Sequence, residues 1–308
     1  MDKTSQPNSR SQNRRSGIAL LITLFFVISV TAAVGVSIIQ LRLSAKQVRE
    51  GKCLIQSSMI LDDLLRLLKT SPLVDKVKDG ESMRYFLYNT SVIPLALENL
   101  NVKINIKSSV GRININTFSS FTPFQEALSG YMLQYDIRDV EYFQDLLIDC
   151  MSGEQPYYRT DIFEAKPWLY REKISSMTHF EQILDYYVMT RHDNNIKKIP
   201  WEELIRFGTH KDNKLDVNYI SPQLWQLLLP ELSEDVANDL ASGEIVYKTS
   251  ENLSLSDDDI IKLETFKISY YVPRTLIEVD VKRNDQNVHV AFEYDLKLKK
   301  GGNFDYGL

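Results

Sequence analysis

The chain has 308 residues, enough for two average domains or for one domain with a large insertion. Its composition, 44% hydrophobic and 25% charged, is typical of a folded globular protein and excludes a wholly disordered chain. The formal net charge of −5 argues against a general nucleic-acid binder, because such proteins carry a basic surplus. We therefore expect no nucleic-acid partner.

The amino-terminal segment is a polar, basic leader followed by an uncharged stretch. Residues 1–17 are rich in Ser, Asn and Gln and include Arg14 and Arg15 shortly before Gly17. No charged residue occurs from Ile18 to Ile39. At about 1.5 Å per residue this stretch spans roughly 33 Å, enough for one hydrocarbon core. We predict a transmembrane helix at 18–39 with the basic amino terminus in the cytoplasm and the rest of the chain outside.

Three kinds of signal fit this segment. One is a plain signal anchor, and another is a secretory signal cleaved at the small residues 31–33. The apolar stretch is longer than a usual secretory signal core and continues past residue 33, which disfavours the second. The third is a prepilin leader, because basic residues and then Gly17 directly before Ile18 resemble that signal. The resemblance implies cleavage by the prepilin peptidase between Gly17 and Ile18, with N-methylation of Ile18.

Ile22 is the fifth residue of the mature chain that such cleavage would leave. Pilins and most pseudopilins carry Glu at this position. A carboxylate in lipid is costly and needs a partner, and in that family the Glu is taken to pair with the amino terminus of the neighbouring subunit. The absence of this Glu is characteristic of the K-type minor pseudopilin, a subunit that would occupy the first position, at the tip of a filament.

Leucines recur mostly at a spacing of three or four after the membrane segment. This pattern predicts an amphipathic helix that ends before Ser71 and Pro72. The leucines are Leu54, Leu61, Leu64, Leu65 and Leu68.

Apolar residues alternate with polar ones in two later regions, which predicts half-buried strands. Val102, Ile104 and Ile106 form the first run, and we interpret Ile113 and Ile115 as the second strand of a hairpin with it. Towards the end of the chain we predict a strand at 266–272 and then two strands joined by a turn at 284–286. The apolar residues of these two strands are Ile277, Val279, Val281, Val288, Val290, Phe292, Tyr294 and Leu296.

Between about Phe118 and Leu263 the apolar period becomes helical. Ser221 before Pro222, Ser233 and Ser256 are predicted N-caps of three helices. A capping box is predicted from Thr178 to Glu181, opening a further helix. One apolar helix face consists of Val140, Phe143, Leu146 and Leu147.

Two local motifs resemble the K-type minor pseudopilins of type II secretion. Gly111-Arg112-Ile113-Asn114-Ile115-Asn116 is similar to the strand that leads into that family's helical domain. The segment 215–233 is similar to its Asn-Val-Asn-Thr-Ala segment and the helix pair that follows, although Asp216 and Tyr219 replace the usual Asn and Thr. The resemblance covers almost the whole chain.

The predicted fold class is α+β. A long amino-terminal helix, part transmembrane and part amphipathic, packs on a small antiparallel sheet in the manner of pilins, and a large all-α domain is inserted between sheet strands. The predicted bounds are 1–17 for the leader, 18–39 for the transmembrane helix and 40–117 for the first part of the pseudopilin domain. They continue with 118–264 for the insertion, 265–300 for the last strands and 301–308 for a tail.

Catalytic signatures such as GxSxG, HExxH or a Gly-rich phosphate loop are absent from the sequence, so we expect no enzymatic activity. The helix pair after residue 221 is similar to a helix-hairpin-helix, but Glu231 stands in its connection where DNA-binding versions have glycines. We expect this helix pair to have a packing role.

Asp257, Asp258 and Asp259 are weak candidates for calcium ligands, because three acids after Ser256 are also ordinary residues for the start of a helix. We otherwise expect no cofactor and no metal. Cys53 and Cys150 either form a disulfide in an oxidising compartment or are two buried thiols.

The resemblance implies a single-pass inner-membrane protein with a periplasmic carboxyl-terminal part. Its function would be that of a structural subunit that caps the tip of the pseudopilus and initiates its assembly in type II protein secretion. The implied partners are other minor pseudopilins, the prepilin peptidase, the inner-membrane assembly platform and the lipid bilayer. The alternatives are a minor pilin of a type IV pilus or of a DNA-uptake pseudopilus, and a signal-anchored periplasmic enzyme or binding protein.

Overall fold

The computed structural model describes residues 55, 57–97, 100–208, 214–283 and 286–307. The chain divides into two compact units, residues 1–58 and 59–308, and the elements below belong to the second. No helix among the described residues is both long and apolar enough to cross a membrane. The predicted leader and the predicted transmembrane helix at 18–39 lie outside the described residues, so both stay predictions.

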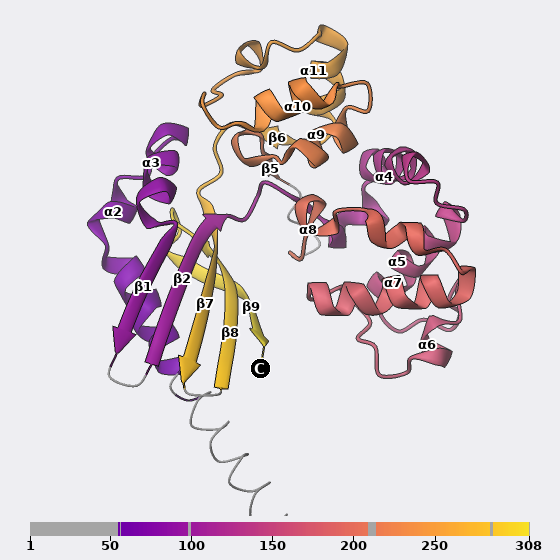
Figure 1. The fold of residues 1–308 in the computed structure, drawn as a ribbon, viewed down its shortest axis with the longest axis horizontal. Coiled ribbons are helices and arrows are strands. Elements are labelled where there is room, and N and C mark those ends of the chain that lie inside the picture. The colour runs from indigo at the N-terminus through magenta and orange to yellow at the C-terminus, as the bar shows by residue number, and fades with distance from the viewer. Residues whose placement is uncertain (1–54, 56, 98–99, 209–213, 284–285, 308) are drawn as a thin grey trace, which may run out of the picture. The chain divides into compact units, whose positions relative to one another are not determined.

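A five-stranded antiparallel sheet forms one part of the second unit (Figure 1). Its strand order is β1-β2-β7-β8-β9. The strands are β1 (Val92–Leu97), β2 (Leu100–Ser108), β7 (Arg274–Arg283), β8 (Gln286–Asp295) and β9 (Lys300–Gly307). Apolar side chains of the three central strands alternate with polar ones and are buried on one face, which confirms the predicted alternation in β2, β7 and β8.

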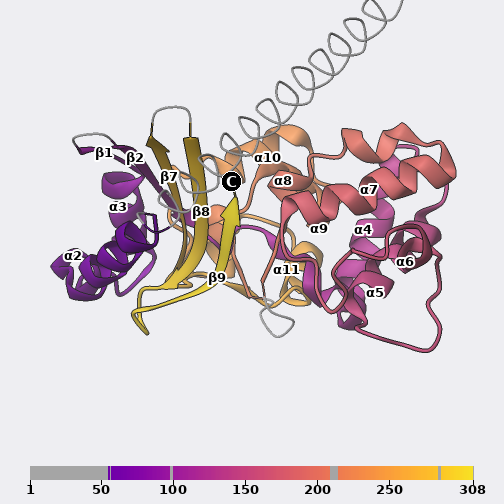
Figure 2. The same cartoon turned by 90° about the horizontal axis from the view of Figure 1, so that it is seen from below.

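Helices cover the apolar face of the sheet. Residues 59–70 are helical and bury Leu61, Leu64 and Leu68, as the leucine spacing predicts. The helix α2 (Pro72–Asp75) follows, and then α3 (Gly80–Thr90), which buries Met83 and Phe86. Figure 2 shows α2 and α3 together on one side of the sheet.

The predicted hairpin between the strand at 102–106 and Ile113–Ile115 is wrong. β2 pairs with β1 on one side and with β7 on the other. Ile113 and Asn114 form the two-residue strand β3 (Ile113–Asn114), which pairs in parallel with β4 (Ile205–Arg206). The Asn114 side chain accepts a hydrogen bond from the Asn116 N–H, and this local turn ends the strand and starts the 3₁₀ helix η1 (Ile115–Ser120).

An insertion, residues 109–273, separates the neighbouring strands β2 and β7. It forms one buried apolar cluster that runs along the chain from Ile113 to Phe266. Its α-helices are α4 (Thr122–Gln134), α5 (Val140–Met151), α6 (Ile162–Ala165), α7 (Met177–Arg191), α8 (Trp201–Leu204), α9 (Pro222–Leu228), α10 (Glu234–Ala241) and α11 (Asp257–Glu264). Short 3₁₀ helices join them at η2 (Asn194–Lys198), η3 (Val217–Tyr219) and η4 (Ser250–Leu253).

Helix starts in the insertion follow local sequence signals. Ser221, Ser233 and Ser256 cap α9, α10 and α11 through their side-chain oxygens, as predicted. The start of α7 differs from the prediction: Ser176, not Thr178, is the N-cap and accepts from the His179 N–H.

The end of the chain differs from the sequence-based expectation in two places. Of the strand predicted at 266–272, only β6 (Ile268–Ser269) forms, and it pairs in parallel with β5 (Leu215–Asp216) inside the insertion, which is therefore not purely helical. The predicted tail is the edge strand β9, paired with β8. Gly301 allows this, because a Cβ there would lie 3.0 Å from the Leu65 side chain. Phe304 stacks on Phe292 with ring centroids 5.3 Å apart.

Candidate functional site at the junction of sheet and insertion

The two motifs that resemble a known family lie where the chain leaves the sheet and where it returns. Antiparallel pairing places Ser108, the last residue of β2, opposite Thr275 at the start of β7. The Ser109 N–H donates to the Arg274 carbonyl at 3.2 Å. The outgoing crossover, residues 109–112, and the returning crossover, residues 270–273, therefore run from neighbouring points of the sheet.

Asp216 ties both crossovers together. Its backbone N–H donates to the Val110 carbonyl at 2.9 Å, on the outgoing side. Its Oδ2 accepts the Val272 N–H at 2.8 Å, on the returning side. Its Oδ1 accepts from both the backbone and the side-chain nitrogen of Asn218, at 3.1 and 3.2 Å. Asp216 is 1% exposed, and this burial raises the pKa of its carboxyl above the ordinary value.

Asn218 extends the same network to two further backbone segments. Its Nδ2 donates to the carbonyls of Tyr247 and Tyr270, at 3.1 and 2.9 Å. Its Oδ1 accepts the Tyr247 N–H at 2.7 Å. A short amide can donate and accept at once, so it replaces a missing strand partner for these backbone groups.

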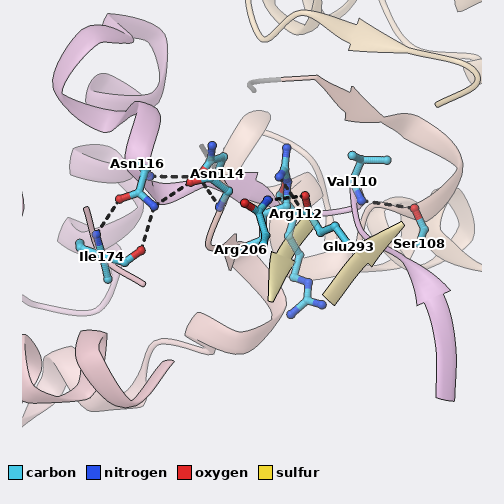
Figure 3. A network of polar contacts seen from close by, with 10 residues as sticks. Ser108, Val110, Arg112, Asn114, Asn116, Ile174, Arg206 and Glu293 are labelled. Carbon is cyan, nitrogen blue, oxygen red and sulfur yellow. Dashed lines mark hydrogen bonds and ion pairs between the residues drawn. The ribbon is translucent and has the colours of Figure 1, made fainter. Parts of the chain in front are cut away.

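The side chains of Asn114 and Asn116 also bind backbone groups of other segments, on the outgoing side (Figure 3). Asn116 Oδ1 accepts the Ile174 N–H at 2.8 Å, and Asn116 Nδ2 donates to the carbonyls of Ile174 and Gly208, at 2.8 and 3.0 Å. Asn114 Oδ1 accepts the Gly208 N–H at 2.9 Å. Both asparagines are 1% exposed. The Asn pattern of this motif therefore holds two other backbone segments of the insertion, those at Ile174 and Gly208.

A nearly buried ion pair joins the insertion to the sheet beside this network (Figure 3). Arg206 Nη1 in β4 lies 3.2 Å from Glu293 Oε1 in β8, and the two side chains are 5% and 12% exposed. Arg206 Nε also donates to the Arg112 carbonyl, and Glu293 Oε2 accepts from Asn303 Nδ2. Sequence reasoning missed this pair because its residues lie 87 positions apart and no local pattern links them.

A cleft of about 390 Å³ lies beside the ion pair and is lined by both the insertion and the polar face of the sheet. Its charged residues include Lys107, whose Nζ lies 2.7 Å from Glu278 Oε1. His289 Nδ1 lies 2.8 Å from Asp280 Oδ1 on the same face of the sheet. The polar groups of this junction mainly pair with each other or with backbone, an arrangement suited to holding two substructures in a fixed orientation.

The residues predicted for processing lie outside the described residues: Arg14, Arg15, Gly17, Ile18 and Ile22. Asp257, Asp258 and Asp259 form the first turn of α11. Ser256 Oγ donates to Asp259 Oδ2 at 2.6 Å. Within the described part of the chain, no three His, Cys, Asp or Glu residues are arranged to hold a metal.

Cys150 lies in α5 and is fully buried. Burial raises the pKa of this thiol to about 12. Cys53 lies outside the described residues, so its pairing with Cys150 stays a prediction.

Comparison with known proteins gives a likeness to a solved structure. No protein-family model matches this chain. No curated protein matches it either. A chain in the crystal structure of the GspK–GspI–GspJ complex from the enterotoxigenic Escherichia coli Type 2 Secretion System aligns with 86% of this chain and 97% of its own length, at a TM-score of 0.56 and 11% sequence identity. The two chains share a fold.

The share of the chain that aligns is more informative here than the sequence identity of 11%. An alignment over 86% of the chain cannot avoid the insertion at residues 109–273, so the likeness takes in both the sheet and the inserted helices. It confirms, at the level of the fold, the resemblance that the motifs at 111–116 and 215–233 indicate.

Proposed function

We propose that this chain is a K-type minor pseudopilin, a structural subunit rather than an enzyme, of a type II secretion pseudopilus. The observation that carries the proposal is the insertion of residues 109–273 between two adjacent strands of a sheet, in a fold shared with a subunit of a type 2 secretion complex. The subunit caps the tip of the pseudopilus and initiates its assembly.

The junction supports a tip position. Filament subunits pack side by side, so a bulky insertion is tolerated only where no further subunit stacks above it. Asp216 holds the outgoing and the returning crossover through Val110 and Val272, and the pair of Arg206 and Glu293 adds a second attachment. An insertion held in this way has a fixed orientation on the sheet and presents a defined surface to cargo or to the outer-membrane channel.

Ile22 supports the same position from the sequence. A subunit at the tip has no amino terminus above it with which a carboxylate at this place could pair, and an unpaired carboxylate in lipid is costly. The proposal places the helix at 18–39 in the inner membrane, the amino terminus in the cytoplasm and the described residues in the periplasm. Other minor pseudopilins, the prepilin peptidase and the assembly platform are the proposed partners.

Amino-terminal sequencing of the mature chain tests this proposal. The full chain is expressed with the prepilin peptidase, and we expect a mature protein that starts at Ile18 and co-purifies with the other minor pseudopilins. Gly17→Glu should leave the full-length precursor in the membrane. Gly130→Glu is the matched control, because a Cβ at that helical position has open space around it, and its maturation should be normal.

Two results would contradict the proposal. One is a mature chain that begins near Val34, which would indicate a secretory signal. The other is normal maturation of Gly17→Glu together with a wild-type chain that forms no complex with other minor pseudopilins.

A further inference from the structure

The insertion carries a groove with an apolar floor on α7 and the segment that follows it. The groove has a volume of about 670 Å³, within the range of about 300–1,000 Å³ that is common for ligand sites. Its floor consists of Leu184, Ile199 and Trp201, with Met177 and Pro200 at its sides. Both α7 and α8, which contribute most of these residues, can be followed in Figure 2.

Trp201 makes this floor rigid and apolar. Its indole Nε1 donates to the Ile196 carbonyl at 2.8 Å, so the only polar atom of the side chain is occupied within the protein. Its ring packs against Phe180 and Phe143, with centroids 5.0 and 5.6 Å away. The floor is therefore apolar and held in place by packing within the protein.

The rim of the groove is acidic. Glu181 and Asp185 lie one turn apart on α7, and Glu202 and Glu203 lie on α8. Among the described residues that line the groove, Lys197 is the cation, and its Nζ is 2.6 Å from Asp185 Oδ1. Within the described part of the chain, the carboxylates of Glu181, Glu202 and Glu203 are exposed and make no ion pair or side-chain hydrogen bond. Arg112 attracts the carboxylates of Glu202 and Glu203 and offsets part of the negative charge of the rim. The net charge of the rim stays negative and favours a cationic partner.

We infer that this groove binds a segment of a partner protein in which a large apolar side chain is flanked by Lys or Arg. The apolar side chain would occupy the floor, and the basic side chains would pair with the rim. Neither contact suffices alone, because exposed ion pairs contribute little and the floor is small. The inference rests on the groove itself and does not require the chain to be a pseudopilin.

Binding of three labelled peptides to the purified full chain tests the inference by fluorescence anisotropy. The first peptide has the sequence Lys-Leu-Lys-Leu-Lys, the second replaces Leu by Ser, and the third replaces Lys by Glu. We expect only the first to bind, with an affinity that falls as salt is added. In the protein, Glu181→Gln with Glu202→Gln should weaken its binding by about tenfold. Glu126→Gln with Glu141→Gln removes the same charge elsewhere on the insertion and should change nothing.

Each other outcome would overturn the inference. Equal binding of the Leu and Ser peptides would mean attraction by net charge alone. Equal effects of the two double variants would place the binding elsewhere on the surface. Binding of the Glu peptide, or binding of none of the three, would exclude a basic apolar partner at this groove.

Discussion

Asp216→Asn replaces one of the two carboxyl oxygens by an NH₂ group. Of these oxygens, Oδ2 holds the returning crossover through the Val272 N–H, and Oδ1 accepts from Asn218. An Asn side chain keeps the size of Asp but has a single oxygen. If that oxygen stays with Asn218, the new NH₂ group points towards the Val272 N–H, which now donates to Oδ2 at 2.8 Å. The NH₂ group and the Val272 N–H are both donors and then face each other, and Val272 is only 6% exposed.

The expected cost follows from the contacts that are lost. A hydrogen bond to a charged acceptor contributes about 1.5–3 kcal/mol, and a buried donor without a partner costs a similar amount. Removing the buried charge offsets part of this, since burial already raises the pKa of Asp216. We therefore expect Asp216→Asn to lower the free energy of unfolding by about 2 kcal/mol. For a domain of this size the melting temperature would fall by about 4–8 °C.

Thermal unfolding and hydrogen exchange, measured on the same samples, check this expectation. Exchange should rise in the returning crossover at 270–273, where the Val272 N–H loses its acceptor, while the central strand β7 stays protected. Asp258→Asn is the matched control, because Asp258 is exposed in the first turn of α11. We expect it to cost no more than about 0.5 kcal/mol.

The reasoning would be refuted if both variants lowered stability equally. It would also be refuted if exchange in the Asp216→Asn variant rose throughout the sheet and not at the returning crossover, because the carboxylate would then act on global stability alone.

Three further predictions concern the same junction. Glu293→Gln breaks a nearly buried ion pair and should lower the free energy of unfolding, measured by chemical denaturation, by about 3 kcal/mol. Glu81→Gln breaks an exposed pair and should lower it by less than about 1 kcal/mol, and equal losses would contradict the difference in burial. A short Gly-containing turn from Ser108 to Arg274 should leave a soluble, folded sheet, as judged by circular dichroism, because these strand ends are already paired; an unfolded product would show that the sheet needs the insertion. Burial raises the pKa of Asp216 in the folded protein above 3.8, so the folded protein binds this proton more readily than the unfolded chain does. Acidification from about pH 7 towards 4 should therefore increase the difference in melting temperature between wild type and Asp216→Asn. A constant difference would contradict the raised pKa.

Local signals in the sequence determined much of the secondary structure. Alternation alone predicted the central parts of β2, β7 and β8, because one face of each strand is buried and its side chains point to it in turn. Serine caps predicted the starts of α9, α10 and α11, since a cap bonds to N–H groups only two or three residues away. The motifs at 111–116 and 215–221 were recognisable by their resemblance to a known family. The sequence did not show which backbone groups their side chains bind.

The tertiary structure alone decided how these elements pair. Ile113 and Ile115 alternate like a sheet strand, yet Asn114 turns the chain and both isoleucines enter the core of the insertion. The partner of β2 is β7, on the far side of the insertion, and the edge strand β9 has a Gly-Gly sequence with little strand propensity. Asp216 accepts a hydrogen bond from Val272, and Arg206 forms an ion pair with Glu293, although each pair is far apart in the sequence. A strand pattern specifies which face is buried, but the partner is chosen by packing and by the need of every buried polar group for a hydrogen bond, and both depend on the whole fold.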